Sequence, residues 1–246
     1  MKGEASVDLP VPATALAIGA HADDAELGCG ATLAKWSAAG ATVHFLVLTD
    51  GSKGSWDPDA DRAALVAERR REQEKAAAAL GIAEVLFLDF VDGELENGRV
   101  ERARVCEVIR TVRPDVVLGH DPWARYRLHP DHRAAGFLVT DGIVAARDPH
   151  FFPDQAVGPH RPERLLLFEA EEPDHFEGVE GFVDAKVEAL LCHRTQWRNT
   201  MEIDPDGPDV DAQRDAFAGR VRDEAAAAGA PAGLPRAEAF KLLDDL

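Results

Sequence analysis

A histidine and three carboxylates follow the first apolar run of the chain. Residues 17–36 read AIGAHADDAELGCGATLAKW, in which His21 precedes the adjacent acids Asp23 and Asp24. Neighbouring carboxylates repel each other, and a divalent cation is the simplest way to offset that repulsion and to use the histidine. Histidine nitrogen and carboxylate oxygen are common zinc ligands, and a catalytic zinc site has three protein ligands and one position open for water.

The stretch HPDH adds two further imidazoles, those of His129 and His132. Pro130 suits the first position of a helix, and residues three apart on a helix lie on one face. The two segments together therefore predict a divalent-metal site. Each segment alone has another explanation, because Asp23 or Asp24 suits the N-cap of a helix and single histidines are often solvated.

Strand-like and helix-like segments alternate along the chain. Continuous apolar runs predict buried parallel strands at 13–20, 42–50, 84–90, 115–120 and 164–170. Helices are expected between them at 25–39, 60–80, 101–112 and 131–146, and later at 210–228. This order is typical of a doubly wound α/β fold, in which ligands bind at the carboxyl ends of the strands. The polar clusters AHADD, TDGSKGSW, DFVDGEL and GHDPWARYRLHPDH all follow strands, so we expect them at one rim.

We therefore expect one α/β domain over 1–246, with a Rossmann-like, mostly parallel sheet flanked by helices. Its core spans about 13–197, and 201–246 forms a C-terminal helical extension in which the closing AEAFKLLDDL is helical by propensity. Segments 148–163 and 201–209 are rich in proline and aspartate and are expected to be loops. We expect 148–163 and the C-terminal extension to form the side of the site that binds the part of a substrate away from the reacting group.

Composition restricts the partners of the chain. It carries 27 basic and 45 acidic residues, a formal net charge of −18, which disfavours nucleic acid and anionic membranes as partners. No run approaches the roughly 20 apolar residues of a membrane span, and the N-terminus lacks the layout of a signal peptide. Three cysteines without CxxC spacing argue for a reducing compartment. We expect a cytoplasmic protein.

These motifs resemble those of the PIG-L/LmbE-like de-N-acetylases. That family carries AHPDD(A/E)E, here AHADDAE, and HPDH, here unaltered at 129–132. Further matches are DG at 50–51, RRREQEKAAAALG at 69–81, VDGEL at 91–95 and KVEALLCHRTQW at 186–197. Ala22 stands where the family usually has proline, which loosens the turn without removing a ligand.

The resemblance implies a role for each matching residue. His21, Asp24 and His132 would be the ligands of Zn²⁺, with Fe²⁺ an alternative because these ligands accept several divalent ions. Asp23 would be the general base that takes a proton from zinc-bound water. His129 would be a cation that stabilises the oxyanion or protonates the leaving amine. We expect its neighbour Asp131 to favour that charge and a nearby metal ion to oppose it.

Four further residues are candidates for substrate binding, each with a structural alternative. Arg69 matches a family position that reaches polar groups of the substrate, but it also lies in a charge run typical of a solvated helix face. Asp92 matches a position that accepts hydrogen bonds from sugar hydroxyls, or is part of a turn with Gly93. Tyr126 donates to an oxyanion or packs.

His193 is the fourth candidate. The resemblance suggests that its segment returns toward the site, whereas the residue pattern alone favours a helix surface. His120, at the end of a strand, is expected to support the site or to be simply buried.

The function expected from these features is a zinc-dependent hydrolase that removes an acetyl group from an N-acetylglucosamine-type small-molecule conjugate. Self-association is compatible with the family. One alternative is a non-catalytic metal- or sugar-binding protein on the same scaffold. The other is a phosphoacceptor signalling domain using Asp50 and Lys53, which is disfavoured because such domains hold magnesium through oxygen ligands and have no use for His21 or HPDH.

Overall fold

The first long strand is buried on both faces of the sheet. The computed structural model describes residues 5–246, and in β2 (Thr14–Gly19) the side chains of Ala15 and Ala17 enter one apolar core. Leu16 and Ile18 enter another core on the opposite face. Because successive strand residues point to opposite faces, a continuous apolar run is what a strand covered on both sides requires.

Eight strands form one mixed sheet in the order β1-β7-β8-β6-β5-β2-β3-β4. β2, β3, β4, β5 and β6 are mutually parallel, while β8 is antiparallel to both β6 and β7. Besides β2, the strands are β1 (Ser6–Val7), β3 (Thr42–Thr49), β4 (Glu84–Phe90), β5 (Val116–His120), β6 (Arg164–Phe168), β7 (His175–Gly178) and β8 (Ala237–Leu243). The predicted α/β fold with a mostly parallel sheet is confirmed.

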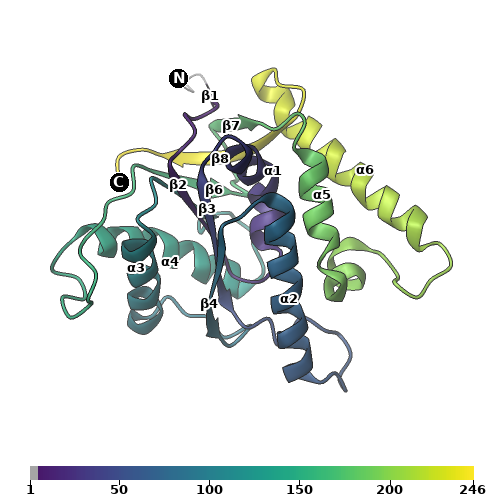
Figure 1. The fold of residues 1–246 in the computed structure, drawn as a ribbon, viewed down its shortest axis with the longest axis horizontal. Helices are drawn as coiled ribbons and strands as arrows, with labels where there is room; N and C mark the ends of the chain where they lie inside the picture. Colours follow the sequence, from purple (N-terminus) through teal and green to yellow (C-terminus); the bar gives the residue numbers. More distant parts are fainter. Residues whose placement is uncertain (1–4) are drawn as a thin grey trace.

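Helices cover both faces of this sheet (Figure 1). α1 (Asp24–Ala38), α2 (Arg62–Leu80) and α5 (Val183–Leu191) lie on one face, and α3 (Arg99–Val112) and α4 (Pro130–Arg147) lie on the other. α6 (Val210–Gly229) packs against α5 and β8 at the outside of the first layer. None of the helices in residues 5–246 has the length and apolar character needed to cross a bilayer.

The prediction of a helix at the C-terminus is wrong for Ala237–Leu243. This segment is strand β8, and it lies between β6 and β7 inside the sheet. Alanine, glutamate, lysine and leucine are good helix formers, but helix propensities differ by less than about 1 kcal/mol per residue, and backbone hydrogen bonds to two neighbouring strands outweigh that preference. Of the segment after residue 201, α6 is helical as expected. β7, which the sequence pattern did not predict, completes the slot for β8.

The order of the central strands creates a crevice at one edge of the sheet. β2 leads to β3 on one side, while β5 lies on its other side, so connections from β2 and β5 leave in opposite directions. Ligands in open α/β sheets bind at such a switch point, beyond the carboxyl ends of the strands. The loops after β2 and β5 carry the two histidine-containing motifs.

Candidate metal centre and active site

A pocket of about 620 Å³ opens at this edge of the sheet. Its walls come from the loops after β2, β3, β4 and β5, from α1, α2 and the start of α4, and from the segment after α5. The lining residues are His21, Asp23, Asp24, Leu27, Lys53, Gly54, Ser55, Trp56, Arg69, Asp92, Gly93, His129, His132, Gln196, Asn199 and Thr200. Pockets of roughly 300–1,000 Å³ are typical of small-molecule sites.

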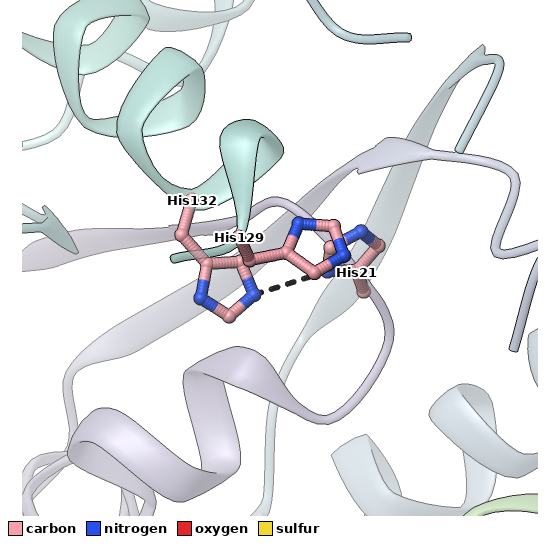
Figure 2. Close-up of side chains that lie close together, drawn as sticks. All are labelled: His21, His129 and His132. Atoms are coloured by element: carbon pink, nitrogen blue, oxygen red, sulfur yellow. Dashed lines mark hydrogen bonds between the residues drawn. The ribbon is translucent and has the colours of Figure 1, made fainter. Parts of the chain in front are cut away.

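The three predicted metal ligands converge in this pocket. His21 Nδ1 lies 3.3 Å from His132 Nε2 and 3.4 Å from a carboxylate oxygen of Asp24. The other Asp24 oxygen is 3.3 Å from His132 Nε2. Ligand atoms at 2.0–2.1 Å from a tetrahedral zinc lie about 3.3–3.4 Å apart. The distances between these side chains are close to that spacing, with a different oxygen of Asp24 facing each histidine. Two groups with ligand atoms close enough to hold one ion meet here: His21, His129 and His132, and Asp24, His120 and His132. Figure 2 shows His132 and His129 projecting from the start of α4 toward His21.

Two carboxylates hold the second nitrogen of His21. Its Nε2 lies 3.2 Å from Asp92 Oδ1 and 3.2 Å from Asp131 Oδ2. Burial lowers the pKa of His21, but hydrogen bonds to Asp131, Asp24 and Asp92 outweigh burial and raise it well above its usual value. A carboxylate on the far nitrogen is the arrangement that fixes the ring of a metal-binding histidine. Nδ1 is thereby directed toward Asp24 and His132.

Asp24 is fixed as firmly as His21. Its Oδ2 accepts the backbone N–H of His21 at 2.7 Å and lies 3.1 Å from His120 Nε2. The Nδ1 atom of His120 in turn lies 3.2 Å from Glu169. Burial raises the pKa of Asp24, but the charge of His120 and the hydrogen bonds from His120 and His21 lower it well below its usual value. His120 therefore supports the site, one of its two expected roles.

His132 is held from its outer side by a cation. Arg127 Nη1 lies 3.1 Å from His132 Nδ1, and the same guanidinium pairs with Glu169. Burial, together with the neighbouring His120 and His21, lowers the pKa of His132 to about 4. The ring is therefore neutral near pH 7, whereas His21, whose pKa is raised, would lose a proton on binding an ion.

Asp23 lies beside this centre with its carboxylate in a different environment. Its backbone is left-handed at φ 93°, and its N–H donates to Gln73 Oε1 at 3.1 Å. Although Asp23 holds the N-cap position of α1, its side chain makes no capping hydrogen bond. Burial raises its pKa to about 6, against the lowering effect of Arg69, whose Nη2 is 3.9 Å away. Strained backbone at a pocket is typical of functional sites.

The Asp131 carboxylate raises the pKa of His129, as expected, but burial and the nearby His21 outweigh it and lower the pKa. The Asp131 carboxylate faces His21 and the backbone N–H groups of Gly93 and Leu95. His129 Nδ1 instead accepts the backbone N–H of Asp131 at 3.3 Å, which caps α4. Because Nδ1 accepts this bond, Nε2 is the ring nitrogen left to contact a ligand, and the ring centroid lies 4.7 Å from that of His21.

Arg69 is not on a solvated helix face. It is 4% exposed, lines the pocket, and donates from Nη2 to the carbonyl oxygen of Ala22 at 2.8 Å. Its guanidinium passes directly over Gly54, where an added Cβ would lie 1.9 Å from Nη1. A residue without a side chain is required there, because the arginine occupies that space.

Asp92 lies in the pocket wall, but its carboxylate contacts protein groups instead of being free for sugar hydroxyls. Its Oδ2 accepts the backbone N–H of Lys53 at 2.9 Å while Oδ1 contacts His21, and hydrogen bonds to His21 hold its pKa at about 2 against the effect of burial. Both oxygens therefore have protein partners. It is part of the pocket wall, as a substrate-binding residue would be.

Tyr126 and His193 do not line the pocket. Tyr126 is 89% exposed, so the packing alternative is wrong. His193 is fully buried rather than on a helix surface, and its Nε2 lies 3.4 Å from Glu26. The segment that follows it does return to the site, because Gln196 is part of the pocket wall.

Several pocket residues were not among the expected site residues, although two of them lie in the TDGSKGSW cluster that we expected at the rim. Lys53 and Trp56 lie on the loop after β3, and Asn199 and Thr200 lie in a short π-helix (Trp197–Met201) after α5. The expectation that 148–163 and the C-terminal segment shape the site is wrong for this pocket, since neither contributes to its wall. The TDGSKGSW cluster at a strand end was the available signal for Lys53 and Trp56.

Comparisons with known proteins agree on one family. A family model described as GlcNAc-PI de-N-acetylase matches residues 16–143. Diacetylchitobiose deacetylase of Thermococcus kodakarensis is 35% identical over 185 residues, which cover 74% of this chain and 69% of that protein. 4-Oxalmesaconate hydratase of Pseudomonas putida is 28% identical, over 73% of this chain and 72% of that protein.

A solved structure gives the same result. N,N′-diacetylchitobiose deacetylase from Pyrococcus horikoshii, complexed with an inhibitor, superposes with a TM-score of 0.83 and 29% identity over 95% of this chain and 84% of that chain. The family model spans more than half of the sequence and includes both histidine motifs of the pocket. The pocket residues outside it are those of the segment after α5. The chain belongs to the GlcNAc-PI de-N-acetylase (PIG-L) family.

Proposed function

We propose that this protein is a metal-dependent deacetylase that hydrolyses the acetamide of an N-acetylglucosamine-type conjugate. The observation that carries the proposal is the convergence of His21, Asp24 and His132 beside Asp23, a buried carboxylate that is free to accept a proton. The diacetylchitobiose deacetylases among the relatives support the same reaction.

His21, Asp24 and His132 would hold the ion, with zinc favoured by the donor set and Fe²⁺ an alternative. When bound, such an ion supplies Lewis-acid polarisation and lowers the pKa of a water molecule to about 7. Asp92 and Asp131 keep His21 in the binding orientation, and His120 does the same for Asp24. These outer contacts are commonly worth 10- to 100-fold in metal affinity or activity.

Asp23 would accept the proton of the attacking water and deliver it to the leaving nitrogen. A group that transfers protons works best when its pKa is near the working pH, and burial moves Asp23 toward that range. Its fixed backbone and the nearby Arg69 limit the directions in which the carboxylate can point.

His129 would donate from Nε2 to the acetyl oxygen as negative charge develops on it. The ring is held by its capping bond at Nδ1, so the opposite nitrogen is directed away from the start of α4. A neutral imidazole can act as such a donor, and a fixed donor of this kind is worth about 10²–10³ in rate.

Arg69 and Asp92 would differ in their roles. Arg69 is placed to reach polar groups of the substrate while also fixing Ala22 and Asp23. Asp92, whose two oxygens have protein partners, is better suited to positioning His21 than to binding sugar hydroxyls. The substrate would be a small amino-sugar conjugate, and self-association and a cytoplasmic location stay predictions.

The hydratase among the relatives is the alternative activity that an experiment has to separate. Its name implies a substrate with several carboxylates, for which a pocket needs unpaired cations. Here Lys53 pairs with Glu94 at 2.9 Å, and Arg69 is next to Asp23 in a wall that also contains Asp24 and Asp92. A neutral acetamido sugar suits this electrostatic environment better.

The test combines metal analysis with acetate release from N-acetylglucosamine and its disaccharide. Asp23→Asn should keep about one divalent ion per chain and lose activity by roughly 100-fold or more. Asp154→Asn, an exposed aspartate on the 148–163 loop, is the matched control and should match the wild type.

Three results would count against the proposal. Full activity of Asp23→Asn would remove the proton-transfer role. Metal retained by both His21→Ala and His132→Ala would remove the ligand assignment. A wild-type protein that releases no acetate from any N-acetylhexosamine conjugate would favour a non-catalytic binding protein, or the hydratase if 4-oxalmesaconate were consumed.

A further inference from the structure

Three polar side chains are buried where α1, α2 and α5 pack together on one face of the sheet (Figure 1). Glu26 on α1, Gln73 on α2 and His193 after α5 are 0%, 1% and 0% exposed. None of them is part of the described pocket wall. A buried carboxylate or imidazole is costly unless it has hydrogen-bond partners, so the partners of this cluster indicate its role.

The side-chain amide of Gln73 connects the backbone of Asp23 to Glu26. Its Oε1 accepts the backbone N–H of Asp23 at 3.1 Å, and its Nε2 donates to Glu26 Oε1. A backbone N–H can only donate and an ionised carboxylate can only accept, so these two partners leave a single orientation for the amide. The position of Glu26 therefore determines where the N–H of Asp23 finds its acceptor.

Glu26 is itself anchored from its other side. His193 Nε2 lies 3.4 Å from the same Glu26 oxygen, and although burial lowers the pKa of His193, the hydrogen bond to Glu26 raises it above its usual value. The segment after His193 is tied to α2, because Glu72 accepts the backbone N–H of Thr195 at 2.9 Å and its hydroxyl at 2.6 Å. The anchor of Gln73 is thus held by α1 and by the segment after α5.

α2 holds both ends of one peptide group beside the candidate metal site. Arg69 Nη2 donates to the carbonyl oxygen of Ala22 at 2.8 Å, and Gln73 accepts the N–H of Asp23, the other end of the same peptide. Arg69 and Gln73 are four residues apart, so they lie on one face of the helix. The left-handed backbone of Asp23, at φ 93°, is unfavourable for a residue with a side chain and persists only where surrounding contacts impose it. This pair of side chains imposes it.

We infer that Gln73, anchored by Glu26 and His193, is a positioning residue that fixes the direction of the Asp23 carboxylate. The inference rests on the proposed function, in which Asp23 accepts the proton of the attacking water. Rotation of the peptide before Asp23 changes φ and with it the direction of the side chain, and a misplacement of about 1 Å can cost about 100-fold in rate. None of the three side chains belongs to the described groups of possible metal ligands, so metal binding is not expected to depend on them.

The experiment measures kcat and KM for acetate release from N-acetylglucosamine or its disaccharide, together with metal content. Gln73→Met keeps a side chain of similar length but removes both hydrogen bonds. Its kcat should fall by about 10- to 100-fold at an unchanged KM and with the metal retained. Gln213→Met is the matched control and should equal the wild type. Gln213 also accepts a backbone N–H, that of Asp204 at 2.7 Å, but it lies on α6 outside the described pocket wall.

Exchanging the two partners tests the hydrogen bonds themselves. Gln73→Glu alone places two carboxylates against each other and should also lower kcat. The double variant Gln73→Glu/Glu26→Gln again offers an acceptor to the N–H of Asp23 and a donor between the two side chains, so its kcat should lie at least about tenfold above that of Gln73→Glu. Where Gln73→Met does not fold, Gln73→Asn, which is one methylene shorter, takes its place.

An unchanged kcat in Gln73→Met, or a fall in kcat that the exchange of partners does not reverse, would overturn the inference while leaving the deacetylase function intact. If the wild type releases no acetate from either sugar, the proposed function fails, and hydrogen exchange of the Asp23 amide, measured by NMR, decides the inference by itself. Exchange that is about tenfold faster in Gln73→Met and slow again in the double variant would support the inference, and any other result would overturn it.

Discussion

Replacing Glu238 by alanine should destabilise the protein far more than replacing an exposed glutamate. α1 contains a break at Cys29, where φ is −151° and ψ is 16°, so the helix after the break has its own unsatisfied N–H groups. The Glu238 carboxylate, on β8, accepts the N–H of Ala31 at 3.1 Å and of Thr32 at 2.7 Å. It acts as a cap supplied from the other end of the chain.

Lys186 completes this arrangement. Its Nζ donates to Glu238 at 2.7 Å and to the carbonyl oxygen of Leu27 at 2.7 Å, just before the break. The side chains of Lys186 and Glu238 are 13% and 6% exposed. Removing the carboxylate therefore leaves two backbone donors and one ammonium group without their partner in a nearly buried place.

The expected loss follows from these contacts. Hydrogen bonds to a charged group are worth about 1.5–3 kcal/mol each, and breaking a buried ion pair costs about 3–5 kcal/mol. Because the contributions overlap, we expect Glu238→Ala to lower the free energy of unfolding by about 3–5 kcal/mol. Glu238→Gln keeps one acceptor oxygen and should lose about half as much. Domains are stable by only about 5–15 kcal/mol, so the effect is large.

Urea denaturation followed by circular dichroism measures this loss. The midpoint should fall by about 1 M or more for Glu238→Ala at an unchanged slope. Glu224→Ala, an exposed site on α6, is the control and should stay within about 0.5 kcal/mol of the wild type. If Glu238→Ala, or Glu238→Gln where the first variant does not fold, unfolds at the same midpoint as this control, the capping argument is refuted.

Three further predictions concern other parts of the molecule. Arg110→Ala should lower the free energy of unfolding by about 3 kcal/mol in urea, because this buried arginine donates to five backbone carbonyl oxygens between residues 145 and 152 and to Gln155. Glu177→Gln should make the free energy of unfolding less dependent on pH in the acid range. Burial raises the pKa of Glu177, but hydrogen bonds from His175 and Lys35 outweigh burial and lower the pKa in the folded protein. The stability that results is present above about pH 4.5 and is lost as the pH falls through the lowered pKa of the folded state. Removing the metal with a chelator should lower the Tm of the metal-loaded wild type and leave the Tm of His132→Ala unchanged. A free metal concentration of 100 times Kd stabilises the folded state by about 2.7 kcal/mol, which chelation removes.

Each of these has a result that contradicts it. For Arg110, the control is Arg104→Ala, an exposed position on α3, and equal midpoints for the two variants would show that the buried bonds add nothing. For Glu177, a Gln variant whose acid unfolding follows that of the wild type would exclude this carboxylate as the group that titrates. A His132→Ala protein that chelation still destabilises would place the metal elsewhere.

The local sequence pattern determined the α/β fold and the edge at which the site lies. Consecutive residues of β2 are apolar, and because consecutive strand residues point to opposite faces, the strand must be covered on both faces. The motifs at 21–24 and 129–132 follow β2 and β5, whose carboxyl ends meet because the strands are parallel. The spacing of apolar residues and the position of each motif along the chain carry this information, because both depend on the local backbone geometry of strands and helices.

Contacts between distant segments were decided only by the tertiary structure. Sequence indicated Asp131 as a partner of His129, yet packing turns its carboxylate to His21, 110 residues away. Glu238 likewise accepts hydrogen bonds from Ala31 and Thr32, which lie 207 and 206 positions before it in the chain. In β8, pairing with two neighbouring strands outweighs the helix propensity of its residues. The direction of a side chain depends on which surfaces meet across the whole domain, and no local pattern in the sequence records that.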